Sequence, residues 1–309
     1  MALQTEGPIS VRDINIELGL LPETPFSFDS LVARTLADKL TGPISLSDFL
    51  GKADVQVLEN NVDRIGGSIY ELFGSPTEAG KFEFQNTAII GSSAADQFRT
   101  GVFPAGSELV IVNTGTVSGF GGAGGSLDPA VSPNNLTNDL RPELNGDPGG
   151  PAILFEFDCE VDNTNGVIQG GGGGGGAASR AFDLKGGYVE GTVGGGGGAG
   201  RSPGDLGVSF LPLLAADGST PTVPGGSGTL TSGGNGSSQN ISSESPTTLT
   251  GGDGGDPGQP GSMGQIINGS SSADSTYRLG LGGAPGAAID KNGNTVTATG
   301  GTIRGPILV

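Results

Sequence analysis

Few residue types in this chain could do catalytic chemistry. The sequence contains no His and a single Cys, which excludes a His-based catalytic triad, a His-ligated zinc site and an internal disulfide. Cys159 alternates with the apolar Phe157 and Val161, so we expect it on the buried face of a strand. Because an apolar environment raises the pKa of a thiol, this position argues against a reactive nucleophile.

Acidic residues occupy the other face of the same segment. Asp158, Glu160 and Asp162 follow one another at every second position, a pattern that could suggest calcium binding. A calcium loop of the EF-hand type needs Gly at the position that Asn163 occupies, so that motif fails. We interpret the three acids as a solvated strand face. No catalytic residue, cofactor site or metal site is therefore predicted.

Glycine-rich loops can also cradle phosphate groups, and the chain has 62 glycines among its 309 residues. The nucleotide-binding pattern GxxxxGK[ST] does not occur. A formal charge of −18 excludes a broad basic surface for nucleic acid or for an anionic membrane. No stretch approaches the roughly 18 apolar residues of a transmembrane helix. The start of the chain lacks the features of a secretory signal, so we expect a protein made in the cytoplasm.

Two uninterrupted glycine runs, residues 170–176 and 194–198, lie between strand-like segments. An isolated run would be a flexible linker, because glycine loses the most backbone entropy on ordering. Backbones without side chains can also pack very closely, so left-handed helices with three residues per turn could lie side by side and hydrogen-bond to each other. Both interpretations stay open. The packed one assigns helix contacts to Gly170, Gly173, Gly176, Gly194 and Gly197.

Strand patterns occupy the middle and the end of the chain. Residues 81–85 alternate with period two, residues 109–112 form an apolar run, and residues 153–161 carry the clearest alternation. Asn292-Gly293 between two apolar segments predicts a hairpin with a type I′ turn. A unit Gly-[Thr/Val]-[Val/Ile]-x-Gly predicts short strands that pin the ends of glycine segments. Its copies begin at Gly115, Gly166, Gly191 and Gly301.

Residues 1–53 repeat a helix-start pattern three times. In each copy, Pro and an apolar residue precede a Ser that can cap a helix. Asp13 and Asp48 lie three residues after their caps, where an acid stabilises a helix start. Short helices of about two turns need something to pack on. They form either a self-contained subdomain or a module that docks on a larger assembly. The copies span residues 8–14, 25–31 and 43–49, with caps at Ser10, Ser27 and Ser45.

Residues 54–75 follow with a heptad-like pattern. The apolar positions are spaced by 3, 4, 3, 4 and 3 residues, as in a coiled coil, and Ile at both seam positions would favour a trimer. Gly66-Gly67 weakens a helix by about 1 kcal/mol per glycine. An ordinary amphipathic helix that faces its own domain is therefore the alternative to an oligomer seam. The seam residues are Val55, Leu58, Val62, Ile65, Ile69 and Leu72.

Several of these segments resemble tailed-bacteriophage virion proteins. GPISVRDINIELG and GPISLSDFLGKA, at residues 7–19 and 42–53, resemble the start of tail-fibre and tail-tip proteins. NGVIQGGGGGGG and GTVGGGGGAG, at residues 165–176 and 191–200, resemble the glycine-rich domains of phage adhesins. Residues 282–307 are similar to the closing segment of those domains. The resemblance implies a virion structural protein, often trimeric, with loops that touch a bacterial receptor.

The resulting prediction is a mainly β protein with short N-terminal helices and a glycine-rich, polyglycine-II-like C-terminal domain. We expect a tail-fibre or tail-tip component that attaches to a host receptor, and not an enzyme; the alternative is a capsid decoration or tail-assembly protein without receptor binding. The expected partners are two further copies of the chain, other virion proteins and a bacterial receptor. The expected parts are a docking module (1–53), a helical connector or seam (54–75), a β-rich middle domain (76–149) and a glycine-rich domain (150–309).

Overall fold

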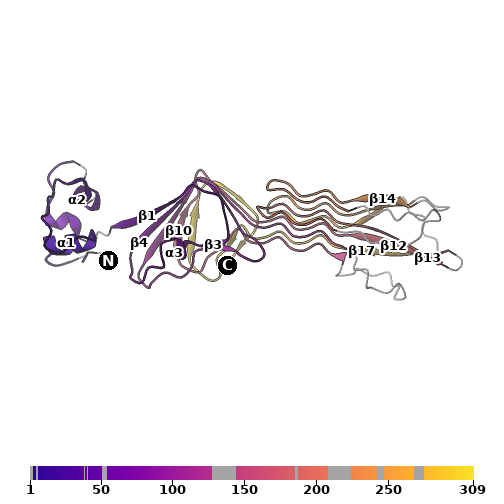
Figure 1. Cartoon of the computed structure of the whole chain (residues 1–309), viewed down its shortest axis with the longest axis horizontal. Coiled ribbons are helices and arrows are strands. Elements are labelled where there is room, and N and C mark those ends of the chain that lie inside the picture. Colours follow the sequence, from indigo (N-terminus) through magenta and orange to yellow (C-terminus); the bar gives the residue numbers. More distant parts are fainter. Residues whose placement is uncertain are drawn as a thin grey trace.

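The molecule is long and narrow, with helices at one end, a β body next to them, a bundle of extended segments, and small sheets at the far end (Figure 1). This computed structural model is mainly β, as the sequence predicts. It describes residues 3–4, 6–37, 39, 41–50, 54–126, 144–184, 187–207, 224–241, 247–267 and 275–309.

Three short helical segments form the N-terminal module. They are α1 (Val11–Glu17), α2 (Leu31–Leu36) and the 3₁₀ helix η1 (Leu46–Phe49). Ile14, Ala33 and Phe49, one from each segment, are fully buried in a core that is separate from the rest of the chain. The rings of Phe26, Phe28 and Phe49 contact one another with centroids 5.2–6.0 Å apart. These apolar contacts hold together helices too short to be stable alone.

The capping serines begin these helices. Ser10 caps α1 as predicted, in a reciprocal arrangement in which the Ser10 N–H donates to the Asp13 carboxylate (2.9 Å). The cap predicted at Ser27 is wrong: α2 starts one turn later, and the Ala33 N–H donates to Ser30 Oγ (3.2 Å). Ser45 begins η1, which is one 3₁₀ turn and not the two-turn helix expected.

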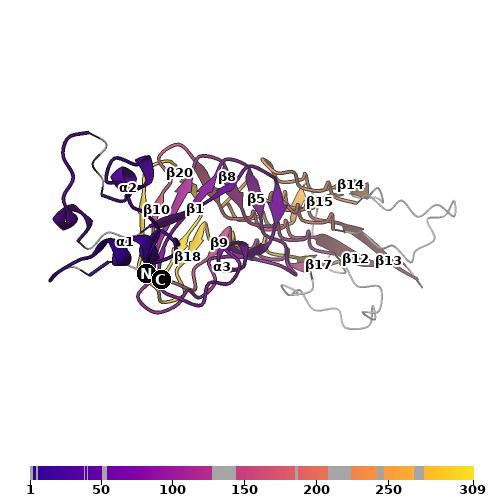
Figure 2. The ribbon, with the colours of Figure 1, turned by 60° about the vertical axis from the view of Figure 1, so that its left-hand side comes forward.

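The β body is built from three parallel sheets that the chain visits in rotation. Sheet A contains β1 (Val55–Asn60), β4 (Lys81–Asn86), β7 (Glu108–Asn113), β10 (Cys159–Asp162) and β19 (Val296–Thr299). Sheet B contains β2 (Arg64–Ile65), β5 (Ile89–Gly91), β8 (Thr116–Ser118), β11 (Val167–Gln169) and β20 (Thr302–Arg304). Sheet C contains β3 (Gly67–Ser68), β6 (Phe98–Arg99), β9 (Ile153–Leu154), β18 (Ile289–Asp290) and β21 (Ile307–Leu308). Each passage through A, B and C adds one strand to every sheet, so the body is a parallel β-helix of five turns (Figure 2).

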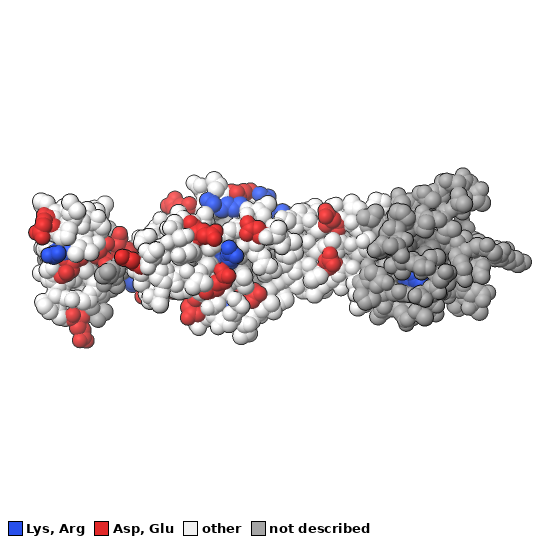
Figure 3. Space-filling model, turned by 60° about the horizontal axis from the view of Figure 1, so that its bottom comes forward, with Lys and Arg blue, Asp and Glu red and all other residues white. Residues whose placement is uncertain are grey.

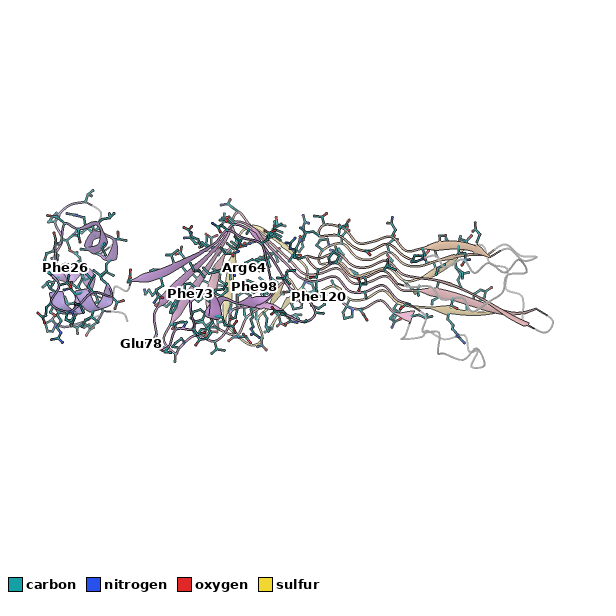
Figure 4. All side chains as sticks on the ribbon, in the orientation of Figure 1. Phe26, Arg64, Phe73, Glu78, Phe98 and Phe120 are labelled. Atoms are coloured by element: carbon teal, nitrogen blue, oxygen red, sulfur yellow. The ribbon has the colours of Figure 1, made fainter. Side chains whose placement is uncertain are left out.

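The interior of the β-helix is filled by large apolar side chains. Phe82 and Phe84 of β4 point inward and are at most 1% exposed, while the residues between them face outward. Phe103 lies at the centre of an aromatic cluster, with ring centroids 4.9–6.1 Å from its neighbours. Its neighbours are Tyr70, Phe73, Phe82 and Phe157. Figure 4 labels Phe73 and Phe98 within this body.

A ladder of buried asparagines runs along the corner between sheets A and B. Asn60, Asn86, Asn113 and Asn163 follow or end the sheet A strands of successive turns, and each of the first three is paired with the next by a side-chain amide bond of 2.7–2.8 Å. All four are at most 2% exposed. Because every buried amide finds a partner on the adjacent turn, the ladder fixes the register between turns.

The helix predicted over residues 54–75 is wrong. Residues 55–60 pair in parallel with β4, and only α3 (Ile69–Leu72) is helical. Gly66 and Gly67 have φ of +66° and +96°, in the left-handed region that no right-handed helix contains. The 3-4 spacing of apolar residues here results from a strand and turns that each place some residues inward.

The strand pairing of the β-helix also corrects two further expectations, a domain boundary and a hairpin. The boundary expected between residues 149 and 150 does not separate two domains, because residues 144–150 belong to the bundle and the sheets of the β-helix join strands from both sides of it. Asn292 and Gly293 form the expected left-handed turn, with φ of +48° and +80°. The turn joins β18 of sheet C to β19 of sheet A, so it is a corner of the β-helix and not a hairpin.

Two antiparallel sheets lie at the far end of the molecule (Figure 1). One contains β12 (Ala178–Leu184), β13 (Gly187–Val193) and β17 (Ser275–Leu279), and the other β14 (Ser238–Ile241), β15 (Thr247–Thr250) and β16 (Gln265–Ile267). Ala178, Val193 and Leu249 are fully buried in a small core to which both sheets contribute. This core ties the two sheets together at the end of the bundle.

Candidate attachment surfaces

The bundle between the β-helix and the far-end sheets consists of ten extended segments, here called the glycine rod. The chain leaves the β-helix between sheets B and C in its third turn, after β8, and in its fourth turn, after β11. Figure 4 shows that side chains are dense on the β-helix and sparse along the rod, with Phe120 labelled near its root. The segments are 119–126, 144–150, 170–177, 194–200, 201–207, 224–229, 232–237, 251–257, 258–264 and 280–286.

Segment 170–177 lies in the middle of the rod. Its backbone N–H groups point in turn to three different neighbours and repeat every third residue, which is the period of a polyglycine II helix. They donate to segments 144–150, 194–200 and 258–264. Its carbonyl groups accept mainly from segments 119–126, 251–257 and 280–286. The segment is thus surrounded by backbone on every side.

Segment 194–200 occupies a second central position beside it. Its N–H groups donate to segments 119–126, 224–229 and 251–257. Its carbonyl groups accept from segments 170–177, 201–207 and 232–237. The other eight segments therefore form a ring around these two. The two longest glycine runs of the sequence are the two helices that have no outer face.

The glycines assigned to packing lie in these two central helices. A Cβ on Gly173 would overlap the carbonyl oxygen of Gly283, and a Cβ on Gly197 would overlap that of Gly204. The same holds for the other three positions. A Cβ on Gly170, Gly176 or Gly194 would meet the carbonyl oxygen of Gly286, Gly280 or Gly207.

The outer segments also carry residues other than glycine, at the positions that face outward. Pro148, Pro203 and Pro260 lie at outward positions and are exposed. Proline has no N–H to donate, so it fits where the helix has no neighbour and cannot fit inside. The root of the rod is also held to the β-helix by an ion pair between Arg201 and Asp63 (3.2 Å).

The residues of the expected oligomer seam do not share one face. Val55, Val62 and Ile65 are about half exposed, whereas Ile69 is fully buried. Leu58 and Leu72 pack against the β-helix core. A single apolar stripe along residues 55–72 is therefore absent.

The N-terminal module, by contrast, exposes aliphatic side chains on all three helical segments and the turns that follow them. Leu21 and Leu31 are 79% and 73% exposed. A contiguous patch of exposed aliphatic side chains is typical of a protein-binding surface. We call this set the N-terminal apolar surface. Its members are Ile16, Leu20, Leu21, Leu31, Val32 and Leu46.

One buried carboxylate joins the module to the β-helix. Glu17, at the end of α1, is 8% exposed and accepts a hydrogen bond from the N–H of Asp54 (3.0 Å), just before β1. Burial raises the pKa of Glu17, and the bond from Asp54 opposes this shift in part. The contact holds the module against the start of β1.

The surface of the protein is strongly acidic. Figure 3 shows Asp and Glu side chains distributed over the module, the β-helix and the near part of the rod, with few Lys and Arg. Burial, with a smaller contribution from Asp158, raises the pKa of Cys159 to about 12, so its thiol stays protonated at the rim of the core. Within the part of the chain that the structure describes, no cluster of His, Cys, Asp and Glu could hold a metal ion, and no helix could span a membrane.

The connections at the far end of the rod fall mostly outside the described residues. The described residues that flank them belong to the far-end sheets or to the outer ends of rod segments, away from the N-terminal module (Figure 1). These connections are residues 127–143, 208–223, 242–246 and 268–274.

Sequence reasoning missed the repeat that builds the β-helix. Its signal is an Asn at the end of the first four sheet A strands or directly after it, followed by Asn or Thr, at Asn60, Asn86, Asn113 and Asn163. Unequal spacing hides the repeat, because the rod interrupts the later turns. Three of the four predicted Gly-[Thr/Val]-[Val/Ile]-x-Gly units are strands of sheet B: β8, β11 and β20.

Comparisons with known proteins agree with this architecture. A family model described as phage tail fibre adhesin Gp38 matches residues 60–308. No curated protein matches the chain significantly. A chain in the crystal structure of the gp37-gp38 adhesin tip complex of the bacteriophage S16 long tail fibre matches with a TM-score of 0.52 and 22% identity. The match covers 98% of this chain and 100% of that one, which shows a shared fold.

Proposed function

This chain belongs to the family of phage tail fibre adhesins called Gp38, and from that premise we propose a division of labour between its two ends. The protein is a virion component of the tail fibre that serves attachment to the host. We propose that the N-terminal apolar surface binds another fibre protein and that the far end of the rod meets the bacterium. The family favours this role over capsid decoration or tail assembly.

The glycine rod is the observation that carries this proposal. A seven-residue segment in this conformation spans about 22 Å, from a rise of about 3.1 Å per residue. The backbone bonds between segments make the bundle a stiff spacer without a side-chain core. Such a spacer holds the far-end sheets away from the fibre, at the end that can reach a receptor first. The proposed role needs no catalytic step.

The N-terminal module supports the docking half of the proposal. The three helical segments begin with Val11, Leu31 and Leu46, each directly after the serine that precedes the segment, and Leu31 and Leu46 are exposed. Three similar elements in one chain fit a partner with three similar binding sites, such as the end of a trimeric fibre. The homotrimer expected from the heptad spacing is an alternative assembly, and light scattering of the purified chain measures it directly.

The test separates the two ends of the molecule. The variant Leu21→Glu/Leu31→Glu places charges on the N-terminal apolar surface, and Leu281→Glu is a matched control on the rod, where Leu281 is also exposed. In pull-down assays with the fibre protein of the same phage, the double variant should lose binding, and the control should keep it. Both should bind host cells as the wild type does. Retention of fibre binding by the double variant would refute docking through this surface.

A further inference from the structure

Sheet A is split at one place, between β7 and β10. The ladder between β4 and β7 starts at the first residue of each strand, Lys81 and Glu108. The ladder between β7 and β10 starts only at Val110 and Glu160. The first two residues of β7 and the first residue of β10 therefore do not pair with each other. The two strand starts therefore diverge on an otherwise continuous sheet.

Backbone bonds on either side hold the split open. The Glu108 N–H donates to the Gly80 carbonyl (2.9 Å), which draws the start of β7 toward β4. The Cys159 N–H donates to the Thr295 carbonyl (3.1 Å), which draws the start of β10 toward β19. The Thr295 N–H completes this side by donating to the Asp158 carboxylate (2.6 Å). The gap is thus built into the hydrogen bonding of the sheet.

The split forms a groove of about 610 Å³, within the range of small-molecule sites. We call it the sheet A groove. Carboxylates, hydroxyl groups and short aliphatic side chains line it together. The acids are Glu108, Asp158 and Glu160, and the hydroxyl groups come from Ser107, Thr295 and Thr297.

This lining selects for one chemical class of ligand. No Lys or Arg lines the groove, and nearby Lys81 is already paired with Glu108 (3.1 Å), so an anion would find no counter-charge. The polar walls disfavour an apolar ligand. Carboxylates accept hydrogen bonds from neighbouring hydroxyl pairs, Ser and Thr both donate and accept, and Val110 offers an aliphatic contact to a ring face. A neutral molecule with many hydroxyl groups can donate to the carboxylates, exchange hydrogen bonds with the Ser and Thr hydroxyl groups, and place a ring face against Val110.

We propose that the sheet A groove binds a neutral saccharide of the bacterial surface, as a second contact besides the far end of the rod. This inference rests on the proposed attachment function, because attachment brings the protein to a bacterial surface that carries such sugars. A weak second site would strengthen attachment through multivalency once the first contact has formed.

The experiment uses the full chain displayed on beads. The probe is the neutral oligosaccharide fraction released by mild acid hydrolysis from the lipopolysaccharide of bacteria to which the chain attaches. Thr297→Trp fills the groove, and Thr302→Trp places the same side chain at an exposed position of β20 outside it. We expect Thr297→Trp to reduce oligosaccharide retention at least tenfold, and Thr302→Trp to leave it unchanged, with equal melting temperatures.

Three results would overturn the inference. The first is no retention of the oligosaccharides by the wild type, and the second is equal retention by Thr297→Trp. The third is a groove that binds cations instead. In that case calorimetry would show that the wild type binds spermidine, that Thr297→Trp does not, and that neither protein retains the oligosaccharides. Attachment of the chain to whole bacteria is measured in parallel. If the chain attaches to whole bacteria but retains no oligosaccharide in the groove, the saccharide inference is wrong and the proposed attachment function stands.

Discussion

Gly173→Ala should destabilise the rod from its centre. Gly173 lies in the segment with no outer face, and an added Cβ overlaps the carbonyl oxygen of Gly283. The Gly283 N–H donates to the Gly174 carbonyl (2.7 Å), and the Gly286 N–H donates to the Gly171 carbonyl (2.8 Å), so both bonds must lengthen as segment 280–286 is pushed away. Two weakened backbone bonds cost about 1 kcal/mol each, and overpacking adds about 1–3 kcal/mol. We expect a total loss of about 3–5 kcal/mol.

The matched control is Gly226→Ala in an outer segment of the same rod. A Cβ on Gly226 meets no atom closer than 3.2 Å, so alanine fits there with little displacement. Its smaller entropy in the unfolded chain makes this change neutral or stabilising by up to about 1 kcal/mol. The comparison therefore isolates the overlap from the general effect of replacing glycine.

Thermal unfolding and hydrogen exchange measure the difference between these variants. A domain of 150–250 residues loses about 2–4 °C per kcal/mol, so Gly173→Ala should lower the melting temperature by roughly 6–20 °C. Amides of the central segments should exchange faster in this variant than in Gly226→Ala, even if the β-helix melts separately. If both variants show the same melting temperature and the same exchange, close backbone packing does not hold the rod together.

Three further outcomes follow from residues of the module and the β-helix. Asn86→Ala removes both ladder bonds of that side chain and leaves buried amides unpaired, so it should cost about 2–4 kcal/mol in thermal unfolding; an unchanged melting temperature would mean that the ladder is dispensable. Ile69→Asp should unfold the β-helix because that side chain is fully buried. Val62→Asp should leave both the stability and the native mass of the protein unchanged, because Val62 is about half exposed. If Val62→Asp lowered the native mass by dissociating an oligomer, the expected oligomer seam would be correct. Burial raises the pKa of Glu17, so the folded state holds its proton more tightly, and stability should fall as pH rises from the unfolded pKa through the folded one. Glu17→Gln should flatten this slope in pH-dependent unfolding, and an identical slope would contradict the assignment.

Local sequence rules predicted those parts of the fold that local forces determine. Ser10 caps a helix because its partner Asp13 lies three residues away, within the same turn. The glycine runs were recognisable because no other residue fits a helix enclosed on all sides, although their sequence alone also allowed a flexible linker. The exposed leucines of the module carry no periodic signal, and nothing local distinguishes Leu21 on the surface from Ile14 in the core.

The errors arose where distant residues decide the structure. The spacing from Val55 to Leu72 matches a heptad, but pairing of β1 with β4 and the left-handed Gly66 and Gly67 make it a turn of a β-helix. Similarly, the groove between β7 and β10 depends on bonds to Gly80 and Thr295, which lie far from it in sequence. No pattern within either strand could have indicated it.

The central position of segment 170–177 has a consequence for how the chain folds. Two of the segments that surround it precede it in the sequence, and the other four, up to 280–286, are synthesised later. The β-helix must likewise hold its fourth turn open from β11 until β18 closes it, before β19, β20 and β21 add the last turn. Contacts this far apart in sequence slow folding, because the entropy of closing long loops is lost before the contacts form. The rod therefore cannot close before segment 280–286 has been synthesised, and its enclosed glycine helix becomes ordered late in folding.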